Sequence, residues 1–415
     1  NELLIMTNQT KISFENTEYA FAAKSDKELN QANFIFGIMG KAWLVNLGLK
    51  ITPVAIKWGI PFTKAIIRKT IFRQFVGGET LEQTAKVADK LETYKVQVIL
   101  DYGVEGKEGE ANFEHARDEF KRVIDYAATQ ANIPFMSIKV TGFARFALLE
   151  KLDAAMHNLS GTLMKRYLQA VESLSDTEKE EWHKVRLRTQ QLCEVADTKN
   201  IGILIDAEET WIQDPVDALT ILMMDVFNKK KPVIYNTLQL YRHDRLQFLK
   251  DSYTAAVERD FILGTKLVRG AYMEKERNRA AEMNYPSPIQ PDKESCDKDY
   301  NAAVEFCIDH LDRTSVIVAS HNEHSNLFTT QLLDKKGLPH NHPHVHFSQL
   351  YGMSDNITFN LAKAGCSVSK YLPFGPIKDV IPYLMRRAQE NSSVSGQTGR
   401  ELMLIKKELQ RRASR

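Results

Sequence analysis

YLPFGPIKDVIPYLMRRAQEN, residues 371–391, is the stretch that decides the fold. The apolar run Cys366–Tyr371 that leads into it is typical of a buried strand, and Gly375-Pro376 then interrupts the chain. A helix should follow with Pro376 at its first position. Its buried face is expected to contain four residues at helical spacing, Ile377, Ile381, Leu384 and Ala388. The stretch therefore predicts one strand-to-helix unit of an α/β protein.

The same helix carries two adjacent arginines beside a tyrosine. Tyr383 lies three and four residues before Arg386 and Arg387, so the three side chains share one side of the helix. Forked guanidiniums next to an aromatic ring suit a small carboxylate with an apolar body. An ordinary surface helix with two solvated arginines would show the same pattern. Pro382 is expected to kink the first turns or to delay the start of the helix.

Upstream, short apolar runs alternate with helical patterns. Eight strands are expected, at Val96–Tyr102, Phe135–Thr141, Ile201–Ala207, Val233–Tyr241, Phe261–Arg269, Ser315–His321, Val345–Tyr351 and Cys366–Tyr371. Continuous apolar strands separated by helices indicate a parallel sheet covered on both faces. Eight such units favour a closed (β/α)8 barrel of the TIM type, with an open doubly wound sheet as the alternative.

The spacing of these units predicts the domain organisation. Residues 1–79 should form an N-terminal helical arm, polar and partly mobile up to residue 33, then helical with breaks at Pro53 and at Gly59-Ile60-Pro61. The barrel should occupy 80–400. The second and third strands are too far apart for one crossover, so 146–199 is expected to be an inserted helical lobe whose last helix starts with a capping box at Ser175 and Glu178. Residues 401–415 should form a short helix that ends in an exposed basic tail containing Arg411, Arg412 and Arg415.

Composition excludes several classes of protein. The chain has 415 residues, 43% of them hydrophobic and 26% charged, with a net charge of +2, which gives no reason to expect nucleic-acid binding. The four cysteines lack CxxC spacing and are expected to be reduced buried thiols. Lysines interrupt the apolar segment 34–62, so no stretch reaches the about 20 residues of a membrane span. That segment is expected either to lie on a membrane surface or to pack on the main domain.

Polar residues cluster where the predicted strands end, which in a barrel is the active-site face. Asp101, Lys139, Asp206, Gln239 and Lys266 all fall there. A lysine in an apolar strand needs a partner, and Asp206 on the neighbouring strand could pair with Lys139, either as a structural ion pair or as a polarised catalytic pair. Lys139 or Lys266 could also serve as the nucleophile of a Schiff-base aldolase. Dinucleotide-binding GxGxxG and Walker loops are absent from the sequence.

Alternating histidines at 340, 342, 344 and 346 have spacing that a metal could use. Because Gly337, Pro339 and Pro343 surround them, they are expected instead to be solvated residues of an exposed loop, and no metal site is assigned.

Four motifs, in this order along the chain, resemble the proline dehydrogenase family of flavin-dependent barrels. They are ILIDAEET (203–210), KLVRGAYMEKER (266–277), VASHNEH (318–324) and YLPFGP…YLMRRAQEN (371–391). The likeness extends from about Thr80 to Asn391 and is closer to the single-function enzymes than to the bifunctional proline utilisation proteins.

The resemblance implies oxidation of L-proline to 1-pyrroline-5-carboxylate, with FAD as the cofactor. It assigns catalysis to Lys139, Asp206 and Lys266. It assigns substrate binding to Lys139, Tyr272, Leu350, Tyr371, Tyr383, Arg386 and Arg387. It assigns cofactor binding to Ala207, Gln239, Lys266, Val268, Arg269, Gly270, Ser320, His321 and Asn322. Glu105 would form a gating ion pair with Arg386.

The resemblance also implies a membrane quinone as electron acceptor, peripheral membrane contact and a pyrroline-5-carboxylate dehydrogenase as partner. The location would be the cytoplasmic side of an inner membrane, or the mitochondrial matrix. Hydroxyproline is the alternative substrate. Two positions depart from relatives: Lys266 replaces an arginine common in bacteria, and Met273 replaces a tryptophan found in some members.

Overall fold

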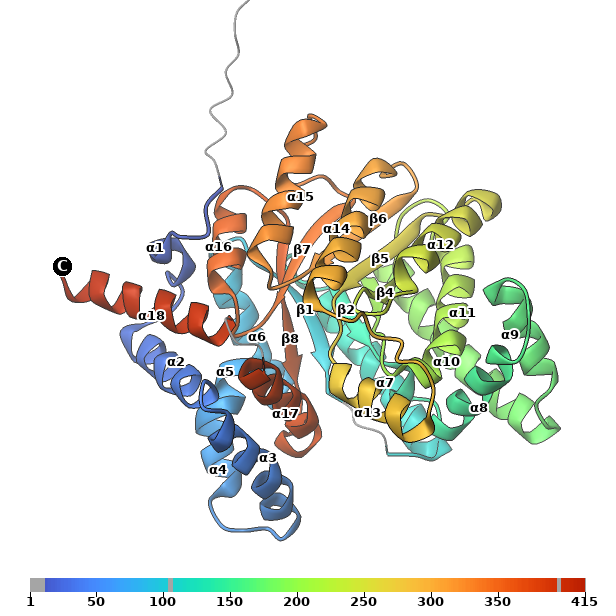
Figure 1. Cartoon of the computed structure of the whole chain (residues 1–415), viewed down its shortest axis with the longest axis horizontal. Coiled ribbons are helices and arrows are strands. Elements are labelled where there is room, and N and C mark those ends of the chain that lie inside the picture. Colours follow the sequence, from blue (N-terminus) through green and yellow to red (C-terminus); the bar gives the residue numbers. More distant parts are fainter. Residues whose placement is uncertain (1–11, 104–106, 394–396, 415) are drawn as a thin grey trace, which may run out of the picture.

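The computed structural model describes residues 12–103, 107–393 and 397–414. A closed barrel of eight parallel strands forms its centre (Figure 1). The strands are β1 Gln97–Tyr102, β2 Phe135–Ile138, β3 Gly202–Ile205, β4 Ile234–Gln239, β5 Leu263–Val268, β6 Thr314–Ala319, β7 Val345–Leu350 and β8 Val368–Phe374. Each strand pairs with its sequence neighbours, and β8 closes the ring by pairing with β1 from Gln97↔Ser369 to Tyr102↔Phe374. The predicted (β/α)8 fold and all eight strands are confirmed. The last strand continues three residues beyond the predicted Tyr371.

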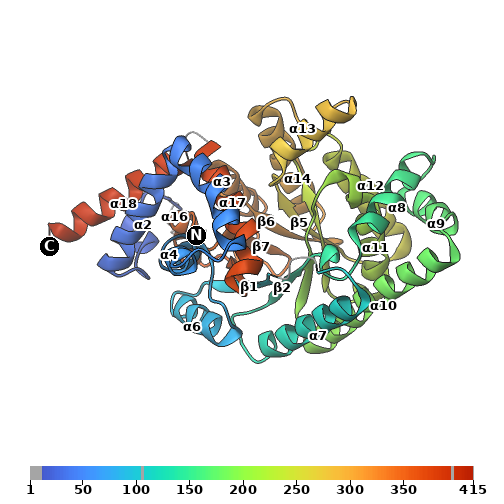
Figure 2. The ribbon, with the colours of Figure 1, turned by 90° about the horizontal axis from the view of Figure 1, so that it is seen from below.

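Helices surround the barrel and connect its strands (Figure 2). They are α6 Leu81–Glu92, α7 Glu110–Ala127, α11 Thr210–Phe227, α12 Arg245–Arg259, α13 Met273–Met283, α14 Lys293–Asp309, α15 Glu323–Lys335, α16 Asp355–Lys363 and α17 Ile377–Ser393. A short 3-10 helix, η2 Val140–Gly142, follows β2. α6 starts at Thr80, whose side chain accepts from the Gln83 amide, while the Gln83 side chain accepts from the Glu79 amide.

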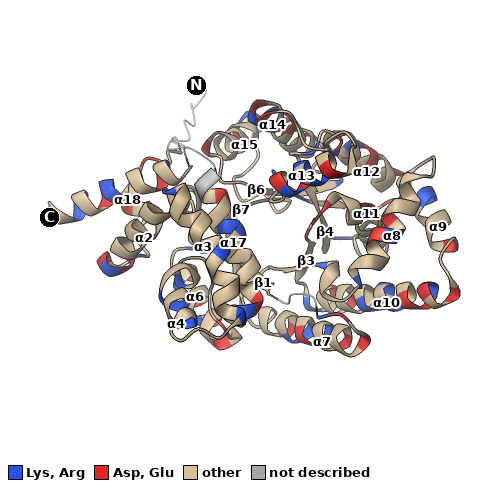
Figure 3. Cartoon of the chain, turned by 60° about the horizontal axis from the view of Figure 1, so that its bottom comes forward, with Lys and Arg blue, Asp and Glu red and all other residues tan. Residues whose placement is uncertain are grey.

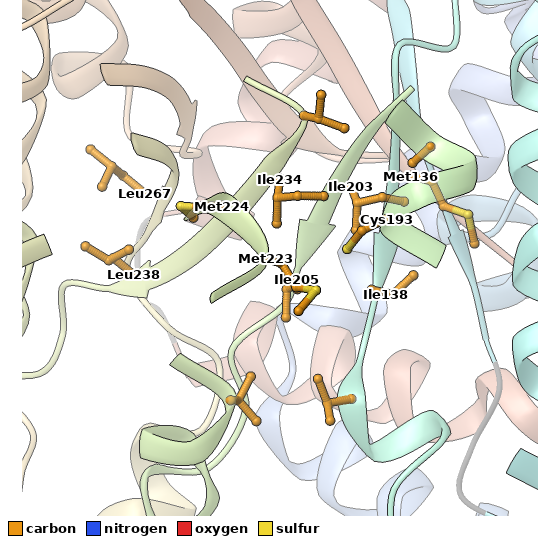
Figure 4. Close-up of a cluster of buried hydrophobic side chains, with 14 of the residues drawn as sticks. Met136, Ile138, Cys193, Ile203, Ile205, Met223, Met224, Ile234, Leu238 and Leu267 are labelled. Carbon is orange, nitrogen blue, oxygen red and sulfur yellow. The ribbon is translucent and has the colours of Figure 1, made fainter. Parts of the chain in front are cut away.

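Alternate residues of each strand face either the helices or the barrel interior. Figure 4 shows the outward set between β2–β5 and two covering helices, including Met136, Ile203, Ile234 and Leu267 with Met224. A smaller inward cluster fills the barrel: Ile99, Leu204, Tyr235, Ile317 and Tyr371. The barrel is thus plugged below its carboxyl end, and the inward side chains at that end are left to form a site.

The predicted insertion is confirmed as three helices between β2 and β3. They are α8 Phe146–His157, α9 Leu163–Glu172 and α10 Asp176–Lys199. α10 begins with the predicted capping box, in which Ser175 and Glu178 exchange hydrogen bonds. α8 packs against α11 and α10 against α7, so the lobe is fixed to the barrel wall.

The N-terminal helices are α1 Thr17–Ala20, α2 Asp26–Met39, α3 Ala42–Lys57, α4 Thr63–Ile67, the π-helix η1 Arg68–Phe72, and α5 Arg73–Phe75. The described part of residues 1–33 contains α1 and the start of α2, which is capped by a box of Ser25 and Glu28. One prediction about this region was wrong. Pro53 does not break α3, because packing of this helix against α2 and α17 outweighs one lost backbone bond.

The C-terminal segment is helical, as expected, but its basic end is not the exposed tail that the sequence predicted. Residues 397–413 form α18, Gln397–Ala413, which packs against α2 with Leu404 and Ile405 buried. Arg411 and Arg412 both bind the buried Glu408, and Arg412 also donates to the carbonyl of Phe21. The basic residues therefore tie the two ends of the described chain together.

All four cysteines are free and buried, as expected. Within the described residues, no single helix is long and apolar enough to cross a membrane. α2 and α3 pass that test only as a pair, bent by 92° at their junction.

Candidate active site

Four charged side chains at the carboxyl ends of β1, β2, β3 and β5 converge on the barrel axis. Lys139 Nζ lies 3.4 Å from Asp101 Oδ1 and 3.5 Å from Asp206 Oδ2. Lys266, only 4% exposed, forms a second ion pair with Asp206. The expected Lys139–Asp206 pair is present, and Asp101 extends it into a network that the strand ends hold in place.

The network favours the charged forms of Lys139 and Asp206. Burial acts against the charged form of Lys139, but Asp101 and Asp206 outweigh it and raise the pKa of this lysine. Burial likewise opposes ionisation of Asp206, yet Lys266 and Lys139 hold the pKa of this carboxyl well below its usual range. A lysine with a raised pKa is a poor Schiff-base nucleophile, because the free amine is scarce at neutral pH.

Tyr371 on β8 completes this floor. Its hydroxyl donates to Asp206 Oδ2 at 2.7 Å, and its ring lies 5.2 Å from Lys266 Nζ. Burial, with Asp101 and Asp206 nearby, raises the pKa of Tyr371 well above its usual value, so the hydroxyl stays protonated. Leu350, the last residue of β7, packs against the same inward cluster.

α17 lies over this floor and supplies the predicted arginines. As expected, Ile377, Ile381, Leu384 and Ala388 are buried. Pro382 does not delay the helix, which begins at Ile377, one residue after Pro376.

The two arginines lie against the two predicted tyrosines. The guanidinium carbon of Arg386 is 5.7 Å from the ring centre of Tyr272, and that of Arg387 is 5.3 Å from the ring centre of Tyr383. Arg387 is only 5% exposed, pairs with Glu390, and keeps a buried Nε without a hydrogen-bond partner. The alternative of two solvated arginines is therefore wrong for Arg387.

A small cavity of about 40 Å³ lies between α17 and the ends of β1 and β2. Arg386, Tyr383, Lys139 and Asp101 all line it. Two cationic groups from different elements thus face one hollow beside a tyrosine, which is an arrangement suited to a small anion with an apolar part.

Buried polar atoms without partners follow the inward face of β4. Thr237 Oγ1 and Gln239 Oε1 make no hydrogen bond, although Gln239 Nε2 donates to the Glu208 carbonyl at 2.9 Å. Such atoms are costly unless a ligand satisfies them. Ala207, half-buried, stands between Asp206 and Glu208 on the adjacent strand end.

The end of β5 turns sharply beside these atoms. Val268 is the last residue of the strand, and Gly270 has a φ of +135°, a conformation that side chains rarely adopt. A Cβ on Gly270 would lie 2.5 Å from the Tyr241 ring, so the backbone approaches that ring more closely than any other residue allows.

Arg269 connects the ends of β5 and β6. It pairs with Asp297, donates to Ser320 Oγ at 2.7 Å and to Ser325 Oγ at 3.0 Å, and stacks 4.3 Å from the Tyr300 ring centre. These contacts fix a guanidinium near the start of α15.

His321 and Asn322 follow Ser320 at the start of the same helix. His321 Nδ1 hydrogen-bonds Ser354 Oγ at 2.9 Å, while Asn322 caps α15 by accepting from the Ser325 amide. Burial, with smaller contributions from Lys370 and Arg387, lowers the pKa of His321 to about 3, so the ring is neutral.

The sequence interpretation missed two features and leaves one untested. Glu208 accepts from the Thr141 hydroxyl at 2.8 Å, and burial raises the pKa of this carboxyl to about 7. Its place two residues after Asp206, at the end of the same strand, was the available signal. His346 was expected in a solvated loop but is buried inside the barrel, with Nε2 2.6 Å from Ser369 Oγ. Glu105, predicted to gate the site, lies outside the described residues.

No group of three or more potential metal ligands occurs among the residues the structure describes.

Comparison with known proteins gives concordant results. A family model described as Proline dehydrogenase matches residues 84–400. Proline dehydrogenase 1, mitochondrial, of Caenorhabditis elegans is 29% identical over 98% of this chain and 89% of its own length. Hydroxyproline dehydrogenase of Xenopus laevis is 30% identical over 94% of this chain and 88% of its own length.

Among solved structures, proline utilization A from Bdellovibrio bacteriovorus, inactivated by N-propargylglycine, superposes with a TM-score of 0.70 at 17% identity. The superposition covers 92% of this chain but only 42% of that one, so the likeness concerns the fold of one part of a longer protein.

Proposed function

Because the chain belongs to the proline dehydrogenase family, we propose that it oxidises L-proline to 1-pyrroline-5-carboxylate with FAD as its cofactor. The observation that supports this best is the cavity lined by Arg386, Lys139 and Tyr383, which adjoins the Asp206 network at Lys139. Proline is a small carboxylate on an apolar ring, and this hollow pairs cations with aromatic walls.

Substrate binding is assigned to the upper part of the site. Arg386 and Arg387, with Lys139, would hold the carboxylate, and Tyr272, Tyr371, Tyr383 and Leu350 would surround the ring. Clamping the carboxylate fixes the ring carbon that loses hydride, and such positioning contributes about 7–11 kcal/mol to lowering a barrier. Arg387 would either leave Glu390 for the substrate carboxylate or bind both, since its Nε lacks a hydrogen-bond partner.

Asp206 would act through the groups it holds. It orients Lys139, Lys266 and the Tyr371 hydroxyl, and helps to raise the pKa of Lys139. Lys266 would supply positive charge where negative charge develops during the reaction, which is the electrostatic contribution most useful to catalysis.

The residues around β4–β6 fit FAD. Gln239 Oε1 and Thr237 Oγ1 need a ligand partner, Gly270 lets the backbone approach closely, and Arg269 offers positive charge for phosphates. Lys266, Gln239 and Ala207 would hold the ring system, with Val268, Arg269 and Gly270 along the chain that links it to the adenylate. Ser320, His321 and Asn322 would contact the adenylate. When bound, the flavin supplies the hydride acceptor.

The test is spectroscopic. The purified protein should be yellow, and anaerobic addition of L-proline should bleach the flavin absorbance. A colourless protein that borohydride links to a carbonyl substrate through Lys139 or Lys266 would support the aldolase alternative. A colourless protein that binds proline unchanged would indicate a binding module.

Hydroxyproline is the second candidate, favoured by one observation: hydroxyproline dehydrogenase of Xenopus laevis is as similar to this chain as a proline dehydrogenase is. The ratio of kcat/KM for L-proline and trans-4-hydroxy-L-proline decides between them. A preference for the hydroxylated substrate by tenfold or more, about 1.4 kcal/mol, would reverse the assignment.

Electrons would pass to a membrane quinone through peripheral contact with the bilayer, and a pyrroline-5-carboxylate dehydrogenase would consume the product. We propose either the cytoplasmic face of an inner membrane or the mitochondrial matrix as the location. The mitochondrial names of several relatives support the matrix. Reoxidation of the bleached protein by a soluble quinone analogue tests the acceptor.

A further inference from the structure

The α3–α4 hairpin, residues 42–67, carries a row of apolar side chains that no part of the described chain covers. On α3 the row follows helical spacing, and it continues through the turn into α4. Its members, with exposed fractions, are Trp43 66%, Leu47 49%, Ile51 52%, Val54 54%, Trp58 79%, Ile60 51%, Phe62 80% and Ile66 62%. Large apolar patches of this kind mark binding surfaces rather than ordinary solvent-facing helices.

α3 is apolar on two opposite sides. Val45 and Ala55 point inward and are buried, and α3 packs there against α17 and α2. Successive residues of an α-helix are rotated by about 100° around its axis, and this rotation places the outward row on the other side of α3. Figure 3 shows α3 as a mostly uncharged helix, whereas α7 and α10 display both signs of charge to solvent. The outward side therefore requires a second apolar contact that packing on the barrel does not explain.

The charge of the region identifies the kind of partner. Residues 41–78 contain seven lysines and arginines and no aspartate or glutamate. All seven are exposed: Lys41, Lys50, Lys57, Lys64, Arg68, Lys69 and Arg73. By spacing, Lys50 and Lys57 border the apolar row, where their stems can lie along lipid while the ammonium groups reach phosphates. An apolar stripe bordered only by cations is typical of segments that lie in the surface of an anionic membrane.

The turn of the hairpin encloses a hollow of about 400 Å³ between the end of α3 and α4. Its walls are apolar apart from Thr63, Lys64 and Arg68. Such a hollow can receive an acyl chain while Lys64 meets the phosphate and Arg68, which pairs with Glu79, lies beside it.

We infer that the α3–α4 hairpin inserts into the surface of an anionic phospholipid bilayer and is the element by which this protein rests on a membrane. It does not span the bilayer, because the apolar residues of α2, among them Leu29, Phe36 and Met39, are buried inside the protein. The basic end of α18 is not the contact, because Arg411 and Arg412 bind Glu408. This inference names the membrane contact through which the proposed transfer of electrons to a quinone would occur. The role of the contact rests on that proposed function, whereas the contact itself does not.

The position of α3 gives the contact a functional setting. α3 packs against α17, which carries Tyr383, Arg386 and Arg387. A bilayer that holds α3 therefore lies next to the helix that covers the mouth of the barrel.

The test is flotation of the full chain with vesicles of phosphatidylcholine alone or with added phosphatidylglycerol. The wild-type protein should float with the anionic vesicles, less so at high salt, and its tryptophan emission should shift to the blue. Trp58→Ser combined with Phe62→Ser should lower the partition coefficient by at least about tenfold. Lys50→Glu combined with Lys57→Glu should remove the preference for anionic vesicles.

Leu168→Ser combined with Val226→Ser is the matched control. It removes two apolar side chains, 56% and 59% exposed, that lie on α9 and α11. This variant should float like the wild type. The inference is overturned if the wild type stays in solution, or if the Trp58/Phe62 variant floats equally well.

A fall in molecular mass of the Trp58/Phe62 variant in solution would also overturn it, since a second copy of the chain would then cover the row. Flotation needs neither proline nor flavin turnover. A protein inactive on proline can still pass this test, and an active one can fail it.

Discussion

At the scale of single residues, Asp206 and Asp101 should contribute differently to the stability of the folded protein. Asp206 is the counter-charge of the buried Lys266, whereas Lys139 has both carboxylates. Asp206→Asn should lower the free energy of unfolding by about 3 kcal/mol, because it leaves a buried ammonium unpaired. Asp101→Asn, the matched control, should cost clearly less, because Lys139 keeps Asp206. Urea unfolding of both variants measures the difference, and equal losses would contradict this account of the network.

Arg386 gives a second prediction at this scale. Arg386→Met keeps the stem that packs beside Tyr272 but removes the charge facing the cavity. The KM for L-proline should rise by a factor of about 30 or more, since loss of one partner of a desolvated charge pair costs about 2–5 kcal/mol. The visible spectrum of bound flavin should stay unchanged.

Arg313→Met serves as the comparison for Arg386→Met. Arg313 pairs with Asp260, and both precede the strands they flank, at the other end of the barrel. Its removal should leave KM unaltered. An equal rise in KM for both variants would show that the effect of Arg386→Met is a general loss of charge.

At the scale of secondary-structure elements, the Gly270 turn after β5 can be tested directly. Gly270→Ala would place a methyl group against the Tyr241 ring and force a residue with a side chain to a φ of +135°. The expected loss of unfolding free energy is about 1–3 kcal/mol, together with weaker flavin retention. Flavin release on dilution and urea unfolding measure the two effects.

Gly337→Ala is the control for Gly270→Ala. Gly337 also has a positive φ, of 66°, but a Cβ there meets nothing within 4 Å. Gly337→Ala should lower the free energy of unfolding somewhat and leave flavin retention unchanged. Retention of flavin by Gly270→Ala at the wild-type level would separate this turn from the proposed cofactor site.

Elements were predictable from the sequence where one physical rule dominates. Strands buried on both faces read as unbroken apolar runs, and all eight were found on that basis. Pro53 was misread as a break because tertiary packing of α3, which the sequence does not display, decides that helix. Likewise the C-terminal helix was expected but its packing was not, since its burial depends on α2, which precedes it by hundreds of residues.

Within the site, the strand ends predicted the Lys139–Asp206 pair but not the other contacts. The Lys139–Asp206 contact follows from adjacent strands. The preference of Arg387 for Glu390, and the hydrogen bond from Tyr371 to Asp206, depend on rotamers and on where α17 settles. These are set by packing after the barrel has formed.

At the scale of the whole molecule, one carboxyl joins α18 to the barrel. Glu401 accepts from the Ser354 amide, and burial, with Asp355 nearby, raises its pKa to about 7. In the unfolded chain it ionises near 4.5, so between pH 4.5 and 7 the folded protein binds more protons, and stability falls as the pH rises. Glu401→Gln should flatten this slope, which amounts to at most about 3 kcal/mol between pH 5 and 8.

Glu408→Gln on the same helix is the control for this pH effect. Although burial acts in the other direction, Arg411 and Arg412 lower the pKa of Glu408 to about 2. Its contribution to stability is therefore complete above pH 4.5, and the variant should lose stability equally at pH 5 and pH 8. Urea unfolding across this range distinguishes the two, and an unchanged slope in Glu401→Gln would contradict the assignment.

The seam between β1 and β8 has a consequence for biosynthesis. Residue 97 cannot find its partner until residue 369 has left the ribosome. α2 likewise waits for α17 and α18, which are translated hundreds of residues later. A nascent chain with so many long-range contacts keeps apolar strands unprotected throughout elongation. We expect its yield in cells to depend on chaperones far more than the stability of the finished enzyme would suggest.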